Sequence, residues 1–226
     1  MFWACLKSIL PDRETSVRIL RGPFRGAIVV MNPRQSLRKI LGLYEHELNP
    51  YLERVLPSVT RVIDVGANDG YFTFGCAAAF RRLGKAGEII SFEPQERHVR
   101  TLGQSIAQKS AGNTRISIVQ ALVGTQVGPG TTTLDAVRWN LGDPICRTNT
   151  LVKIDVEGAE LDVLKGASSW LDPSNHFLIE VHEESLLESI VRLFGSRSLQ
   201  LARIDQRPIR LLGREMRSTQ NWWLVS

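Results

Sequence analysis

From Arg61 onward the chain alternates short apolar runs with segments of helical periodicity, and this alternation limits the fold more than any other feature. The apolar runs are RVIDV, EIISFE, RISIVQAL, LVKIDV and HFLIEV, and the spacing predicts helices at about 70–83, 95–109, 159–171 and 184–194. Strands this apolar are buried on both faces, which is typical of a parallel sheet covered by helices on both sides. SLQLARID and NWWLVS, at the end of the chain, are expected to add an antiparallel hairpin.

The residues before this alternation are expected to form a lead-in. Residues 16–31 alternate around a Gly-Pro turn and predict a hairpin, and LRKILGLYEHELNPYLERVL predicts two short helices. A length of 226 residues with 43% apolar residues fits one α/β domain with an appendage. We therefore divide the chain into 1–57, a hairpin and helical lead-in, and 58–226, a Rossmann-like domain.

Charge and cysteine content indicate a soluble cytoplasmic protein. The net charge is +5, but no five like charges stand in a row, so nucleic acid is not the expected partner. Cys5, Cys76 and Cys146 form no pair with zinc-site spacing and are interpreted as free thiols. No segment approaches the roughly 18 apolar residues of a membrane span. The oligomeric state is left open.

The segment VIDVGANDGYF, residues 62–72, combines a strand end with a glycine turn. Gly66 allows a tight turn, and Gly70 opens a helix whose first N–H groups attract negative charge. Asp64 places a carboxylate beside these donors, which suits a ligand with an ammonium and a carboxylate better than a phosphate. The dinucleotide pattern GxGxxG is absent, which disfavours a nicotinamide dehydrogenase.

The next strand ends in SFEPQ, so Glu93 is placed to accept the hydrogen bonds of a ribose diol. Together with the glycine turn this predicts a site for an adenosine attached to an amino acid, that is, S-adenosylmethionine. Gln120, or the backbone at Ala121 and Leu122, is expected at the adenine edge. The alternative is that the turn is only a tight connection and that Glu93 only caps the following helix.

Ionisable residues gather where two further strands end. The two segments KIDVEGAE and IEVHEE supply the candidates Asp155, Glu157, Glu160, Glu180, His182 and Glu183. A carboxylate at the end of a buried strand must be paired or functional, so we predict Asp155, Glu157, Glu180 and His182 as catalytic residues. Glu160 is interpreted instead as an acid that stabilises a helix N-terminus.

The sequence leaves two alternatives for the chemistry at these residues. His182 titrates near neutrality and is a candidate general base. Alternatively, the carboxylates and the imidazole together bind a divalent cation that orients the substrate. The prediction favours a site without metal.

Several motifs together resemble the FkbM-type methyltransferase family, whose members are S-adenosylmethionine-dependent class I enzymes. They are LGLYEHEL, VIDVGANDGYFTF, SFEPQ, TTLD, KIDVEGAELDVLKG and FLIEVHEE, and the likeness covers roughly Leu41 to Val181 plus the closing NWWLVS. The resemblance implies a class I methyltransferase Rossmann-like fold with a mostly parallel seven-stranded sheet and an antiparallel last strand. It also implies methyl transfer, usually to a hydroxyl oxygen.

By motif position the resemblance assigns cofactor binding to Asp64, Gly66, Asn68, Gly70 and Glu93, and it places Tyr44 and Glu45 where such domains close the pocket. The chain departs from the family in one connection: residues 123–130 replace a longer stretch.

The sequence therefore predicts an S-adenosylmethionine-dependent methyltransferase that acts on a hydroxyl of a small molecule or glycan. Two rival hypotheses remain: an RNA-directed enzyme of the same fold, and an S-adenosylmethionine-binding module that has lost catalysis.

Overall fold

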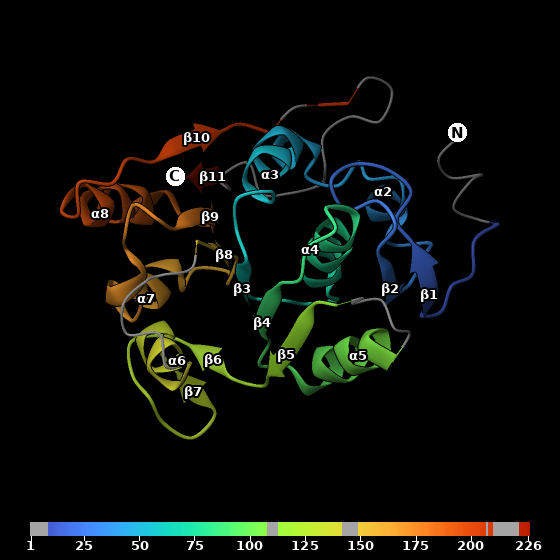
Figure 1. Ribbon diagram of the computed structural model, residues 1–226, viewed down its shortest axis with the longest axis horizontal. Coiled ribbons are helices and arrows are strands. Elements are labelled where there is room, and N and C mark those ends of the chain that lie inside the picture. Colours follow the sequence, from blue (N-terminus) through green and yellow to red (C-terminus); the bar gives the residue numbers. More distant parts are fainter. Residues whose placement is uncertain (1–8, 108–112, 142–148, 207, 210–221) are drawn as a thin grey trace.

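The computed structural model describes residues 9–107, 113–141, 149–206, 208–209 and 222–226, and its centre is one seven-stranded sheet (Figure 1). The strand order is β10-β11-β9-β8-β3-β4-β5. The five parallel strands are β3 (Arg61–Val65), β4 (Glu88–Phe92), β5 (Arg115–Val119), β8 (Thr150–Ile154) and β9 (His176–Val181). The last strand, β11 (Trp222–Val225), runs antiparallel to both β9 and β10 (Ala202–Ile204). The predicted mostly parallel sheet with an antiparallel end is confirmed.

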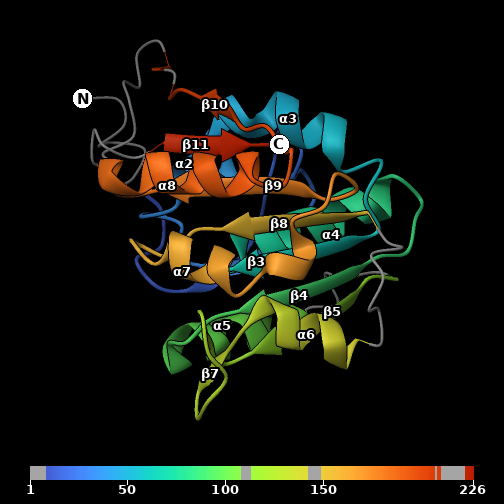
Figure 2. The same cartoon turned by 90° about the vertical axis from the view of Figure 1, so that its left-hand side faces the viewer.

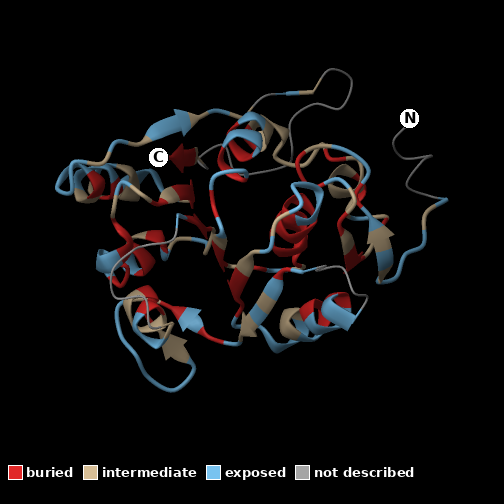
Figure 3. Cartoon of the chain, viewed as in Figure 1, coloured by how far each residue is buried: buried red, intermediate tan, exposed pale blue. Residues whose placement is uncertain are grey.

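Helices cover both faces of this sheet, as Figures 1 and 2 show. One face carries α3 (Asn49–Val55), α4 (Tyr71–Arg82) and α5 (Glu96–Ala107), and the other carries α6 (Leu134–Asn140), α7 (Glu160–Lys165) and α8 (Glu184–Gly195). Alternation along the strands divides the core between the faces, since Val62 packs in the first layer and Ile63 in the second. Figure 3 shows the result: buried residues in the strands and on the inner sides of the helices.

The lead-in contains the predicted hairpin, because β1 (Thr15–Arg18) pairs antiparallel with β2 (Ile28–Met31). The short helices α2 (Leu37–Ile40) and η1 (His46–Leu48) follow it. Phe24 of the hairpin turn packs edge-on against Tyr71 and Phe72 of α4, with ring centroids 5.2 and 5.5 Å apart. The described part of the lead-in thus shares a core with the α4 side of the sheet.

The helix predicted over 159–171 is shorter than expected. It ends at Lys165, and a separate turn of 3-10 helix, η2 (Ser168–Trp170), follows. Asp135, from the TTLD motif, accepts hydrogen bonds from the backbone N–H groups of Ser168 (3.0 Å) and Ser169 (2.9 Å). These bonds tie the chain after α7 to α6, so this motif has a structural use here.

The connection after β5 forms a small parallel pair, β6 (Leu122–Val123) with β7 (Thr131–Thr132), beside the main sheet. Of the cysteines, Cys76 is fully buried, which raises the pKa of its thiol, whereas Cys5 and Cys146 lie outside the described residues. Among the described helices none has both the length and the apolar character that a membrane crossing requires.

Candidate active site

A cavity of about 360 Å³ opens where the parallel strands β3, β4, β8 and β9 end. This is the edge of an open α/β sheet at which ligands bind. The residues predicted from sequence that line it are Tyr44, Gly66, Asn68, Glu93, Asp155, Glu157, Glu180 and His182. The fold therefore brings the two predicted sets, from β3–β4 and from β8–β9, into one cavity.

Gly66 fixes the turn at the end of β3. Its φ of +84° lies in the left-handed region, and a Cβ atom there would meet the carbonyl oxygen of Asp155 at 1.9 Å. Only glycine tolerates both conditions. The N–H groups of Gly66 and Ala67 donate to the carbonyl oxygen of Phe92, both at 3.0 Å. The turn is thus held closely against the ends of both β4 and β8.

Glu93 lies on the cavity wall with only 4% of its surface exposed. Its Oε2 accepts a hydrogen bond from Asn68 N (2.8 Å), and its Oε1 accepts one from Gln95 N (2.9 Å). The carboxylate therefore joins the glycine turn to the start of α5, which agrees in part with the alternative of a local cap. Each oxygen still has a second lone pair that can accept a hydrogen bond.

Three predicted cofactor residues do not line the cavity. Asp64 is fully buried and accepts a hydrogen bond from Thr73 Oγ1 at 2.6 Å, so its carboxylate fixes α4 to the sheet. Gly70, with φ +84°, precedes the first residue of α4. Gln120 is exposed and its Nε2 donates to the carbonyl oxygen of Pro94 at 3.4 Å. Beside it, the alternative residues Ala121 and Leu122 do line the cavity.

Tyr44 forms the cavity rim on the lead-in side. Its ring packs edge-on against Tyr71, with centroids 5.6 Å apart, and Lys39 Nζ lies 4.9 Å from its centroid. Lys39 is in turn paired with Asp69 at 2.6 Å. Glu45, the next residue, adopts a left-handed conformation with φ 49°. The lead-in therefore contributes Tyr44 to the cavity wall, and a role of this residue in cofactor binding stays a prediction.

The opposite end of the cavity gathers titratable side chains from β8 and β9. One ligand atom from each of Asp155, Glu180 and His182 lies within 4.8 Å of the others. His182 Nε2 is 3.6 Å from Asp155 Oδ1. Glu157 lines the same wall from a left-handed backbone position with φ 51°. All four predicted catalytic residues therefore face one space.

Glu160 has a larger part in this cluster than the sequence interpretation gave it. It is the first residue of α7, as expected, but its side chain is fully buried. Its Oε1 lies 2.6 Å from His182 Nδ1 and accepts a hydrogen bond from Gly158 N at 2.9 Å. Sequence periodicity does not reveal which acid of a first turn faces inward, so this contact was missed.

Lys153 is the second residue that the sequence analysis missed. It is 5% exposed, and its Nζ lies 3.4 Å from Asp64 Oδ1 and 3.1 Å from Asp155 Oδ2. The same ammonium donates to the carbonyl oxygen of Gly66 at 2.9 Å. The signal was available, because a lysine inside the apolar run LVKIDV must be paired when buried.

These contacts set the charges of the cluster. Burial lowers the pKa of Lys153, but Asp155 and Asp64 outweigh it and raise this pKa overall. Burial acts against ionisation of Asp155, yet Lys153 holds the pKa of that carboxyl below its ordinary value. For His182, burial is outweighed by the hydrogen bond to Glu160 and by the nearby Glu180, so its pKa is raised. The acids at this end of the cavity therefore stabilise the cationic forms of Lys153 and His182.

Comparisons with known proteins agree with this architecture. The family model of the methyltransferase FkbM domain matches residues 101–194, and no curated protein matches the chain. An FkbM methyltransferase from Methylobacillus flagellatus KT superposes with a TM-score of 0.56 at 18% identity, covering 98% of this chain and 57% of that one. Precorrin 8w decarboxylase from Methanobacterium thermoautotrophicum gives a TM-score of 0.50 at 13% identity, covering 79% of this chain and 88% of that one.

At these identities the solved structures show the fold alone, and the present chain spans 57% of the length of the FkbM methyltransferase. The family match adds to this, because residues 101–194 include TTLD, KIDVEGAELDVLKG and FLIEVHEE, three of the motifs that carry the resemblance. The resemblance is confirmed for this part of the chain: residues 101–194 match the methyltransferase FkbM domain.

Proposed function

We propose that this protein transfers a methyl group from S-adenosylmethionine to a hydroxyl oxygen of a small molecule or glycan. One observation supports this most directly: a single cavity has Glu93 on one wall and Asp155, Glu180 and His182 on another. The reaction requires two kinds of group in one cavity. One is a carboxylate that accepts hydrogen bonds from the ribose hydroxyls, and the other is a group that activates the acceptor hydroxyl.

The residues at the first end fit the cofactor. The carboxylate of Glu93 is held by two backbone N–H groups and still has lone pairs for a ribose diol. The wall beside it is formed by Ala121, Leu122 and Val123, and an apolar surface of this kind suits an adenine ring. The negative charge at the far end suits a sulfonium.

Bound S-adenosylmethionine supplies an electrophilic methyl group, whose bond to sulfur breaks as the bond to the acceptor oxygen forms. The protein has to hold the acceptor oxygen at about 3 Å from the methyl carbon. It also has to accept the proton that the hydroxyl loses. We assign both tasks to the wall formed by Asp155, Glu157, Glu180 and His182, where acceptor groups for a proton converge.

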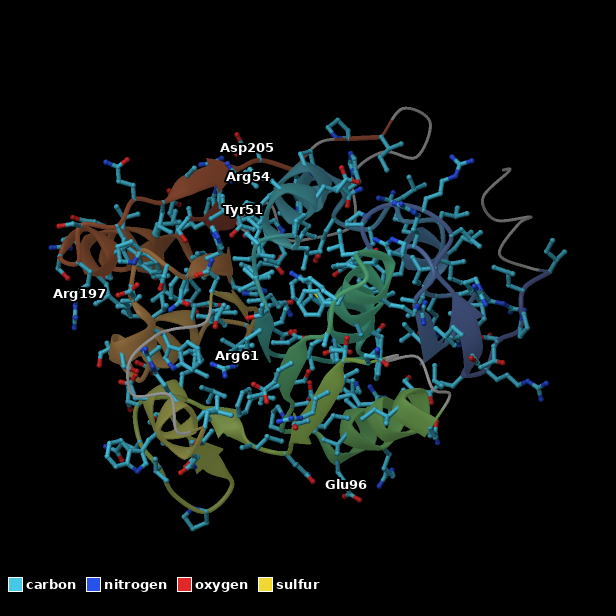
Figure 4. The ribbon with its side chains drawn as sticks, viewed as in Figure 1. Tyr51, Arg54, Arg61, Glu96, Arg197 and Asp205 are labelled. Carbon is cyan, nitrogen blue, oxygen red and sulfur yellow. The ribbon has the colours of Figure 1, made fainter. Side chains whose placement is uncertain are left out.

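Replacing Glu93 tests the ribose contact. Glu93→Ala should weaken S-adenosylmethionine binding by about 2–4 kcal/mol, measured by titration calorimetry, because charge-assisted hydrogen bonds are lost. Glu93→Gln keeps the shape and one carbonyl oxygen and should lose less. The control Glu96→Gln changes an exposed acid at the start of α5, labelled in Figure 4, and should bind like the unchanged protein. Equal affinity in Glu93→Ala would contradict the assignment.

Activity has to be tested separately from binding. Incubation with S-adenosylmethionine labelled in the methyl group, across a panel of hydroxylated small molecules and glycans, should give a labelled ether. Binding without any labelled product would favour a module that has lost catalysis. Labelling of RNA instead would favour the rival RNA-directed enzyme.

A further inference from the structure

We propose that Asp155, Glu180 and His182 bind a divalent metal ion that positions and activates the acceptor hydroxyl. The proposal rests on the proposed function only for the role of the ion, because the ligand set itself stands on geometry. The three side chains come from the ends of β8 and β9, line the cavity and present ligand atoms within 4.8 Å of one another.

The spacing of the ligand atoms fits an ion between them. His182 Nε2 and Asp155 Oδ1 are 3.6 Å apart, which is too long for a hydrogen bond. Two ligand atoms that each lie about 2.1 Å from one ion are separated by roughly 3.0–3.4 Å in octahedral or tetrahedral geometry. A movement of a few tenths of an ångström would therefore complete this pair of ligands.

Glu160 prepares the imidazole for this role. It lies 2.6 Å from His182 Nδ1, which leaves Nε2, the nitrogen nearer Asp155, as the ligand atom. A metal-binding histidine almost always donates its other N–H to a carboxylate, a carbonyl or a water. Lys153 likewise orients Asp155, since it pairs with Oδ2 and leaves Oδ1 on the side of His182.

The charges around the cluster also call for a cation. Asp64 and Asp155 pair with Lys153, whereas Glu160 and Glu180 lie on the side of His182. Buried acids are costly, and a divalent ion bound by Asp155, Glu180 and His182 would add positive charge beside them at the cavity surface.

The donor set indicates the kind of ion. One imidazole nitrogen with two carboxylates suits first-row ions such as Mn²⁺, Co²⁺ or Zn²⁺ better than Ca²⁺. Such an ion would bind the acceptor oxygen and lower the pKa of its hydroxyl, so that the proton leaves more easily. The sequence analysis favoured a site without metal, so this proposal departs from it.

The test measures binding of Mn²⁺ to the full-length chain, prepared with chelator and then dialysed. Free Mn²⁺ gives a six-line electron paramagnetic resonance signal that disappears on binding. Titration should show one site per chain. If the signal of free Mn²⁺ is undiminished at millimolar protein, the proposal is wrong.

Variants locate the site. Asp155→Asn and His182→Gln should each weaken Mn²⁺ binding by at least about tenfold, the lower limit for the loss of even an outer partner. Glu184→Gln changes an exposed acid at the start of α8 outside the cavity and should bind Mn²⁺ like the unchanged chain. Equal affinity in all three variants would overturn the assignment. Far-ultraviolet circular dichroism verifies that each variant is folded, and Asp155, the more exposed carboxylate, is the safer change.

The proposed metal site and the proposed cofactor site can be contradicted independently of each other. Calorimetric titration of S-adenosylmethionine in the presence of chelator measures the cofactor site alone. Cofactor binding without Mn²⁺ binding overturns only the metal site. Mn²⁺ binding without cofactor binding supports the metal site and contradicts the proposed methyl transfer.

Discussion

The two ends of the cavity are built in different ways. At the β3–β4 end the backbone determines the shape: Gly66 and Ala67 donate to Phe92 O, and Glu93 is held by the N–H groups of Asn68 and Gln95. At the β8–β9 end side-chain charges determine it, through the contacts among Asp155, Glu160, Glu180 and His182. The first end is preorganised by local geometry, whereas the second depends on a balance of charge.

Lys153 contacts both ends of the cavity. Its ammonium donates to Gly66 O at the first end and pairs with Asp155 at the second. It also pairs with Asp64, the carboxylate that holds Thr73 of α4. A change at this residue should therefore affect both ends, whereas changes elsewhere should separate them.

The largest effect on stability is expected at Gly66, where the backbone of one end of the cavity contacts the backbone of the other. Gly66→Ala places a Cβ 1.9 Å from Asp155 O at φ +84°, so β3 and β8 must separate. We expect a loss of about 4 kcal/mol in the free energy of unfolding, measured by urea denaturation. Gly84→Ala is the matched control, since φ is +66° but nothing lies within 4 Å of the added atom, and it should cost about 1–2 kcal/mol. Equal losses would show that the close approach is not important.

Removing the connecting charge should have the next largest effect. Lys153→Met leaves Asp64 and Asp155 without their shared cation and should cost about 3 kcal/mol of unfolding free energy. The control Lys165→Met breaks an exposed pair with Asp162 and should stay within about 0.5 kcal/mol. Thermal and urea denaturation measure both variants. A stability loss in Lys153→Met no greater than in the control would show that the two ends are independent.

A smaller and more local effect is expected at Glu160. Glu160→Gln keeps the shape but removes the charge behind His182 Nδ1. It should weaken Mn²⁺ binding about tenfold, or about 1.4 kcal/mol, and leave S-adenosylmethionine affinity unchanged. Asp162→Asn, on the exposed side of the same helix, serves as control. A change in cofactor affinity would show that the ends are coupled through the imidazole.

The smallest effect should come from a contact remote from both ends. Tyr51 of α3, labelled in Figure 4, donates its hydroxyl hydrogen to Phe177 O near the start of β9 (2.8 Å). Burial raises the pKa of this hydroxyl, so it remains a donor at neutral pH. Tyr51→Phe should cost about 1 kcal/mol of unfolding free energy. Binding of cofactor and of Mn²⁺ should be unchanged, and a change in either would argue against the separation of the two ends.

The sequence by itself determined the layered fold and the β3–β4 end of the cavity. Apolar runs and helical spacing report burial directly, and a glycine turn after a strand acts through residues that are adjacent in the chain. Gly66, Asn68 and Glu93 could therefore be identified as cavity residues before their positions were known.

Only the tertiary structure decided the contacts of the β8–β9 end and of the residues behind both ends. Glu160 meets His182 across 22 positions of sequence, and Lys153 meets Asp64 across neighbouring strands in register. Asp64 has the motif position of a ligand residue, yet strand alternation turns it toward α4 and away from the cavity. The physical reason is that a charge is paired by whichever group the packing brings within a few ångströms, and local patterns do not contain that distance.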